Sequence, residues 1–119
     1  MQLDIDLNKG VLTVGIKGEL DISNADRLRE ALEKSLDEKP ARHLVFNFSQ
    51  VDFIDSSCLG VVLGRYKRVH AAGGKVAIIG AKPHVYRILQ LSGLFHLIDD
   101  FDSEEEAVKG YVGGEPVCG

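Results

Sequence analysis

The chain has 119 residues, of which 45% are hydrophobic and 27% are charged, and its formal net charge is -4. This length suits one domain with a real core, and the composition excludes a largely disordered chain. The negative charge argues against direct binding of nucleic acid, which needs clustered Lys and Arg. No apolar run approaches the roughly 18 residues of a membrane span, and the N-terminus lacks the basic flank of a secretory signal. We therefore expect a soluble, cytoplasmic protein without a membrane or nucleic-acid partner.

The N-terminal segment predicts a β-hairpin. Aliphatic and polar residues alternate from Leu3 to Leu7 and again from Val11 to Lys17. This period of two is typical of half-buried strands, and residues 8–10, Asn-Lys-Gly, supply turn chemistry between them. Gly18 is expected to end the second strand.

A helix is predicted after the hairpin. Ser23 and Asp26 have the spacing of a capping box, with Asp in place of the usual Glu, and Pro40 prevents the helix from continuing. The intervening apolar residues recur at helical intervals over about three turns, and they are Ala25, Leu28, Leu32 and Leu36.

The middle of the chain predicts two buried strands joined by a helix. Residues 43–48 and 75–80 form the apolar runs, and residues 56–72 lie between them. A strand, a helix and a second strand favour a right-handed parallel crossover. The sheet is therefore expected to combine the antiparallel hairpin with parallel strands.

Further helices are predicted toward the C-terminus. Pro83 suits the first turn of one helix and Gly93 its end, and Ser103 with Glu106 has capping-box spacing at the start of another. Residues 94–98 are expected to add a short last strand. The fold class is thus α/β, a mixed β-sheet made of an N-terminal hairpin plus parallel strands, with about four helices packed on it.

The stretch FIDSSCLG, residues 53–60, places polar side chains where a strand gives way to a helix. Asp55 or Ser56 can cap the helix by accepting a hydrogen bond from a free backbone N–H. Ser56, Ser57 or Cys58 as a nucleophile would need an activating base, but the histidines belong to no recognisable motif, so no enzyme activity is expected. An exposed serine at this position would tolerate a phosphate, because the helix dipole favours negative charge.

The helix that follows has an unusual outer face. Leu59, Val62, Leu63, Tyr66 and His70 project to one side, which is expected to pack on the sheet. The other side carries Ser57, Val61, Gly64 and Arg68, with Gly60, Arg65 and Lys67 near its edges. The exposed valine and the two glycines allow two interpretations: a docking surface for another protein, or relief of crowding against a neighbouring helix.

Four segments resemble anti-sigma factor antagonists of the STAS domain family. They are GELD at residues 18–21, FIDSSCLGVVLGRYK at 53–67, GGKV at 73–76 and LSGLF at 91–95. The likeness is colinear from about Leu3 to Tyr111. It implies a single STAS domain over residues 1–111, followed by a flexible C-terminal tail over residues 112–119.

The resemblance implies that the protein is a regulatory switch. The unphosphorylated form binds an anti-sigma factor that is also a serine kinase, and this frees a sigma factor, here of the sporulation class. Phosphorylation by that kinase reverses the binding, and a PP2C-type phosphatase resets the switch. The kinase supplies ATP and magnesium, so no cofactor and no metal is expected in this chain.

The same resemblance implies the functional residues. The phosphoacceptor is the serine directly after the motif aspartate, which is Ser56. The residues expected to contact the partner lie at this corner and along the helix face, and they are Asp21, Asp55, Ser57, Val61, Gly64 and Arg65.

One position departs from the family pattern, because Cys58 stands where the family usually has glycine. Its side chain is expected to occupy the first helical turn or to tighten the approach of the kinase, and the first is favoured because Cys is small. Two other functions stay open: a stress-response antagonist, and a STAS subunit of a transporter.

Overall fold

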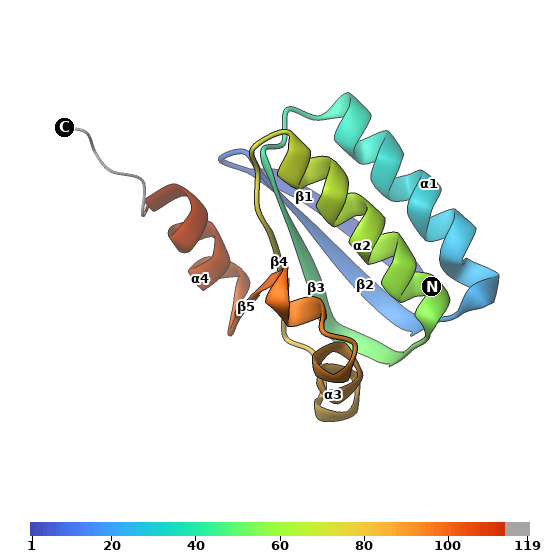
Figure 1. Ribbon diagram of the computed structural model, residues 1–119. Helices are drawn as coiled ribbons and strands as arrows, with labels where there is room; N and C mark the ends of the chain where they lie inside the picture. The colour runs from blue at the N-terminus through green and yellow to red at the C-terminus, as the bar shows by residue number, and fades with distance from the viewer. Residues whose placement is uncertain (114–119) are drawn as a thin grey trace.

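The computed structural model describes residues 1–113, which form one five-stranded sheet covered by helices on both faces (Figure 1). The strand order follows the chain, with β1 antiparallel to β2 and every later neighbour parallel. This confirms the predicted mixed sheet. The strands are β1 (Gln2–Asn8), β2 (Val11–Leu20), β3 (His43–Ile54), β4 (Val76–Ile79) and β5 (Asp99–Phe101).

The hairpin of β1 and β2 turns through two residues. Lys9 and Gly10 both have positive φ, 53° and 79°, as the type I′ turn of a tight hairpin requires. The prediction that Gly18 ends the second strand was wrong. Gly18 adopts a φ of 116° at a register shift within the strand, and β2 continues to Leu20. A bulge that only glycine adopts easily therefore bends the strand without ending it.

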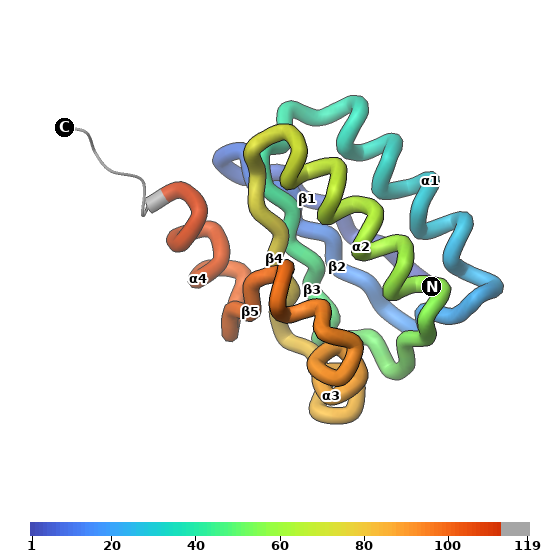
Figure 2. The backbone as a smooth tube through the Cα atoms, in the orientation of Figure 1, coloured from blue at the N-terminus to red at the C-terminus, as the bar shows by residue number. Residues whose placement is uncertain are grey.

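Helices α1 (Ile22–Glu38) and α2 (Ser56–Ala71) lie side by side on one face of the sheet. Both start at the end of the sheet where β2 and β3 finish, as the tube in Figure 2 shows. The first helix is longer than predicted, and its N-cap is Asp21, whose side chain accepts from the Ser23 amide. The predicted capping role of Ser23 was therefore wrong.

The main core fills the space between this helical layer and the sheet. Alternate residues of the strands point into it, in keeping with the period of two. Its fully buried members include Leu12, Val14, Leu44, Phe46 and Ile78 from the sheet, together with Leu28, Leu32 and Val62 from the helices.

A second, smaller core covers the opposite face of the sheet. The C-terminal helix α4 (Glu104–Val108) and the helical turn Lys109–Gly113 pack there, and Ser103 caps α4 as predicted by accepting from the Glu106 amide. The helical turn includes Val112 and Gly113, and the rest of the predicted tail, residues 114–119, lies outside the described part. The buried members of this core are Val11, Val45, Ala77, Ile79, Ala107 and Tyr111.

The segment between β4 and β5 contains helix α3 (Pro83–Leu91). Gly93 follows it with a φ of 82°, as expected for a residue that ends a helix. The predicted strand over residues 94–98 was wrong, because Leu94–His96 form a 3₁₀ turn and the last strand starts at Asp99. Within residues 1–113, every helix is too short or too polar to cross a lipid bilayer.

Candidate functional site

The candidate site is the corner where α1 and α2 begin. Leu20 at the end of β2 pairs with Ile54 at the end of β3, so the two helices that follow start next to each other. Asp21 is the N-cap of α1 and Asp55 is the N-cap of α2. The structure therefore brings together two acidic caps that are 34 positions apart, as the family resemblance implied.

The two caps hold their helices in slightly different ways. The Asp21 carboxylate accepts from the amide of Ser23 at 3.0 Å and from its hydroxyl at 2.5 Å. The bond from the Ser23 hydroxyl holds the pKa of Asp21 below its ordinary value. The Asp55 carboxylate accepts from the amides of Ser57 at 2.9 Å and Cys58 at 3.4 Å. Both carboxylates thus lie at the positive ends of helix dipoles.

The two serines after Asp55 differ in their access to solvent. Ser56 is the first residue of α2 and is exposed, whereas Ser57 is half-buried. Three histidines are engaged elsewhere: His43 with the Lys75 amide, His70 stacked on Tyr66, and His84 with the Asp52 carbonyl. The geometry at Ser56 therefore presents an exposed hydroxyl to an incoming molecule.

Cys58 is fully buried beneath this corner, and its thiol donates to the Asp21 carbonyl at 3.4 Å. Burial raises the pKa of the Cys58 thiol to about 11, and the carboxylates of Asp55 and Asp21 add to the shift. The side chain therefore occupies the interior side of the first helical turn. The alternative that it narrows the path of an approaching kinase was wrong.

The outer face of α2 is smaller than the helical projection predicted. Val61 is 6% exposed and Arg65 9% exposed, because α1 packs beside α2 and covers them. The Arg65 guanidinium is 3.2 Å from the Glu33 carboxylate of α1. The expected exposure of these two residues was wrong, and their role in contacting a partner stays a prediction. His70, placed on the core side by the same projection, is exposed.

The two glycines of α2 do not relieve crowding. A β-carbon added at Gly60 or Gly64 would meet no atom within 4 Å. The interpretation that they make room for the neighbouring helix was therefore wrong. A glycine in a helix costs about 1 kcal/mol relative to alanine, and at these positions no packing within the described chain offsets that cost.

Two exposed apolar side chains that are close in sequence to the capping aspartates were missed by sequence reasoning. Ile22, the first residue of α1, is 77% exposed, and Phe53, near the end of β3, is 44% exposed. Each lies within two residues of a capping aspartate in the sequence, which is the signal that could have found them. Ile22 begins α1 at the corner, and an exposed large apolar side chain beside polar groups is typical of protein interaction sites.

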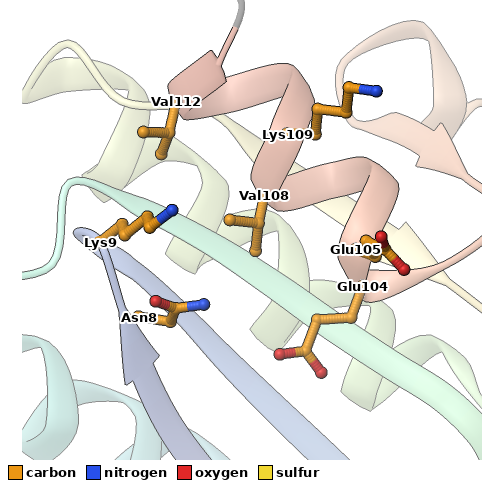
Figure 3. Close-up of a pocket in the computed structure, with 7 residues that line it drawn as sticks. All are labelled: Asn8, Lys9, Glu104, Glu105, Val108, Lys109 and Val112. Carbon is orange, nitrogen blue, oxygen red and sulfur yellow. The ribbon is translucent and has the colours of Figure 1, made fainter.

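A groove of about 630 Å³ lies elsewhere, between the turn of the hairpin and α4 (Figure 3). Asn8 and Lys9 lie on the hairpin side of it, and Glu104, Val108 and Val112 project toward them from α4 and the turn after it. Its lining residues are Asn8, Lys9, Glu104, Glu105, Val108, Lys109 and Val112. None of them belongs to the predicted site, which involves the opposite, α1–α2 side of the sheet.

Comparison with known families assigns the class of protein. Residues 2–107 match the model of the STAS domain, and the chain belongs to this family. It is 36% identical to an anti-sigma F factor antagonist of Paenibacillus polymyxa, over 91% of this chain and 92% of the relative. It is also 28% identical to the anti-sigma-B factor antagonist of Bacillus subtilis, over 92% of this chain and 98% of the relative.

Solved structures agree with this assignment. The unphosphorylated form of the anti-sigma factor antagonist SpoIIAA superposes with a TM-score of 0.81 at 26% identity, covering 94% of this chain and 97% of that one. The phosphorylated form of the Bacillus cell fate determinant SpoIIAA gives a TM-score of 0.71 at 25% identity, covering 92% of this chain and 98% of that one. Sequence and structure together support the function of an anti-sigma factor antagonist.

Proposed function

We propose that the unphosphorylated protein binds an anti-sigma factor that is also a serine kinase, and that this releases a sporulation sigma factor in the cytoplasm. The kinase then phosphorylates Ser56 with its own ATP and magnesium, and the antagonist lets go. A PP2C-type phosphatase removes the phosphate. In this scheme the antagonist carries out no catalysis.

The observation that carries the proposal is the position of Ser56. It is exposed, it is the first residue of a 16-residue helix, and it directly follows the capping Asp55. A phosphate adds roughly 1.5 to 2 negative charges at pH 7, and the positive end of a helix dipole accommodates them without opposing the fold. Ile22 supplies exposed apolar surface at the same corner.

The mode of release follows from the same geometry. Because the phosphate would sit at a helix start, we expect the phosphorylated protein to keep its fold, so the partner is lost through added charge and volume at the interface. The match of this chain to SpoIIAA structures of both phosphorylation states supports one shared fold. A crystal structure of the phosphorylated protein with α2 melted or turned would contradict this expectation.

Mass spectrometry after incubation with the cognate kinase and ATP tests the central step. We expect phosphate on Ser56 and on no other serine. Phosphate on Ser57 alone, or none, would count against the proposal. The half-buried position of Ser57 makes Ser57→Ala a suitable control, which should still be phosphorylated.

Binding measurements test the switch itself. Ser56→Asp places a negative charge at the phosphorylation position and should abolish binding of the anti-sigma factor. Ser56→Ala should bind and should not be released on addition of ATP. Equal affinities of the two variants would refute the switch.

A stress-response antagonist is the second candidate, favoured by the similarity to the anti-sigma-B factor antagonist. It shares the phosphoserine switch and differs in the sigma factor released. The neighbouring genes distinguish the two, since the kinase and its sigma factor are expected beside this one. The likeness to the anion transporter Slc26a9, at 18% identity, shows the fold alone, and permease genes in the neighbourhood would be needed to favour a transporter subunit.

A further inference from the structure

Three consecutive residues that lead from β2 into α1 are each hydrogen bonded to the start of α2. The Leu20 carbonyl accepts from the Asp55 amide at 3.0 Å, and the Asp21 carbonyl accepts from the Cys58 thiol at 3.4 Å. The Ile22 amide donates to Asp55 Oδ2 at 3.0 Å. The two helix starts are therefore cross-linked, and Asp55 makes two of these three bonds.

The two carboxylate oxygens of Asp55 serve different helices. Oδ1 accepts from the Ser57 and Cys58 amides of α2, whereas Oδ2 accepts from the Ile22 amide of α1. One oxygen would be enough to cap α2. The second oxygen fixes the first residue of α1, whose side chain is 77% exposed beside the corner.

We propose that Asp55 is a positioning residue that couples the phosphorylation state of Ser56 to the start of α1. By binding the Ile22 amide, Asp55 holds Asp21 and Ile22 in register with Ser56, so that the partner meets one preformed surface. A phosphate on Ser56 loosens this link. The consequence for the partner rests on the proposed function, whereas the coupling itself does not.

The coupling follows from competition between two anions. The phosphate adds roughly 1.5 to 2 negative charges on the residue next to Asp55, and the amide donors of the first turn of α2 are already bonded to Asp55. Mutual repulsion weakens the hold of the carboxylate. Its bonds within the turn of α2 are part-buried, whereas the bond from Ile22 is exposed and reaches across to another helix, so the bond from Ile22 is the one that opens.

The substitution Asp55→Asn should remove the bond from the Ile22 amide and keep the cap of α2. The amide oxygen of asparagine caps a helix as well as aspartate does, so α2 keeps its cap. The NH₂ group then takes the place of Oδ2 and faces the Ile22 N–H, donor against donor. The matched control is Asp52→Asn, which makes the same change of charge in β3, where Asp52 pairs with Lys82 instead.

NMR of the complete, uniformly ¹⁵N-labelled chain tests the coupling without any partner. In Asp55→Asn we expect the Ile22 amide proton to move upfield and to exchange roughly tenfold faster, with the Ser57 amide unchanged, as for loss of one charge-assisted bond. Asp52→Asn should leave both amides as in the wild type. Phosphoserine incorporated at position 56 during translation should reproduce the change at Ile22. An Ile22 amide that is unaffected by Asp55→Asn, or by the phosphoserine, overturns the proposal.

Binding of the anti-sigma factor tests the consequence. Asp55→Asn should weaken binding about tenfold and raise KM for phosphorylation without changing kcat, while Asp52→Asn should match the wild type. A variant with a released Ile22 amide and unchanged affinity contradicts the positioning role. If the wild-type protein binds no anti-sigma factor, the proposed function fails, and the NMR comparison still decides the coupling.

Discussion

At the scale of single residues, Cys58 shows how a reactive side chain becomes structural. Its thiol is buried under the corner, donates to the Asp21 carbonyl, and has a pKa raised to about 11 by burial and by two nearby carboxylates. Thiolate is the nucleophilic and oxidisable form of cysteine. Cys58 is therefore a packing residue that links two helix starts, and redox control through it is disfavoured.

The reactivity of this thiol gives the first prediction. A rise in pKa from 9.0 to about 11 leaves about a hundredfold less thiolate at pH 8, so iodoacetamide should alkylate Cys58 far more slowly in the native than in the urea-unfolded protein. Mass spectrometry of the peptide containing Cys58 measures both rates. Equal rates would show that the thiol is accessible in the native state.

The raised pKa of Cys58 also makes the stability of the protein fall at high pH. Because the folded pKa lies above the unfolded one, folding favours the neutral thiol, and this contribution is complete below about pH 9 and disappears as the pH rises toward 11. Cys58→Ser should lack this part of the pH dependence. Urea unfolding of the two proteins at pH 8 and pH 10.5 makes the comparison.

At the scale of elements, α1 and α2 are joined by an ionic cluster. Glu33 contacts both Arg65 and Arg68, and Arg68 also pairs with Asp37 at 2.7 Å. Arg65 is buried, and its Nε and Nη1 atoms have no hydrogen-bond partner among the described residues. Glu33 therefore balances the buried positive charge of Arg65, and the ion pair holds α2 beside α1.

Removing the negative charge of Glu33 should destabilise the protein. Glu33→Gln is expected to lower the free energy of unfolding by about 2 kcal/mol, because a buried guanidinium loses its only charged partner among the described residues. Asp26→Asn removes the same charge from an exposed pair with Arg29 and should cost less than about 0.5 kcal/mol. Urea denaturation separates the two. Equal losses would mean that Arg65 is well solvated.

Replacing the two glycines of α2 should change stability and partner binding in opposite directions. Gly60→Ala with Gly64→Ala should raise stability by about 1 kcal/mol or more, since the added methyl groups meet open space and alanine favours the helix. The same methyl groups should weaken binding of the anti-sigma factor if its surface approaches this face closely. Thermal unfolding and calorimetric titration report the two effects. Unchanged affinity would show that the partner docks elsewhere.

The elements also show what the sequence could and could not predict. Local signals were sufficient for the hairpin, for α2 and α3, and for the cap at Ser103, because each depends on neighbouring residues. The buried positions of Val61 and Arg65 were missed, because a helical projection assumes one contact surface and α2 packs against both the sheet and α1. The bond from Ile22 to Asp55 joins positions 33 residues apart and leaves no local pattern.

At the scale of the whole molecule, the sheet separates two cores with different tasks. The α1–α2 core supports the corner at Ser56, and the smaller core under α4 supports the other face (Figure 1). Tyr111 is central to the second core. Its ring lies tilted against that of His43 and edge to face with Phe101, and its hydroxyl donates to the Asp99 carboxylate at 2.7 Å.

This separation predicts that substitutions in the core under α4 change stability without changing the affinity for the partner. Tyr111→Ala should lower the free energy of unfolding by about 3 kcal/mol through loss of a buried ring, and affinity of the folded protein for its partner should stay unchanged. Tyr111→Phe keeps the ring, loses the bond to Asp99, and should cost about 1 kcal/mol. A partner affinity that falls with Tyr111→Ala in the folded protein would place the interface on both faces.

The exposed position of Ser56 bears on the lifetime of a phosphate attached to it. Phosphate monoesters hydrolyse extremely slowly in water without a catalyst. His43, His70 and His84 are engaged away from this corner. A phosphate on Ser56 would therefore outlast the signal that placed it. The phosphorylated protein would persist after the kinase is no longer active, and the abundance of the phosphatase would set its lifetime.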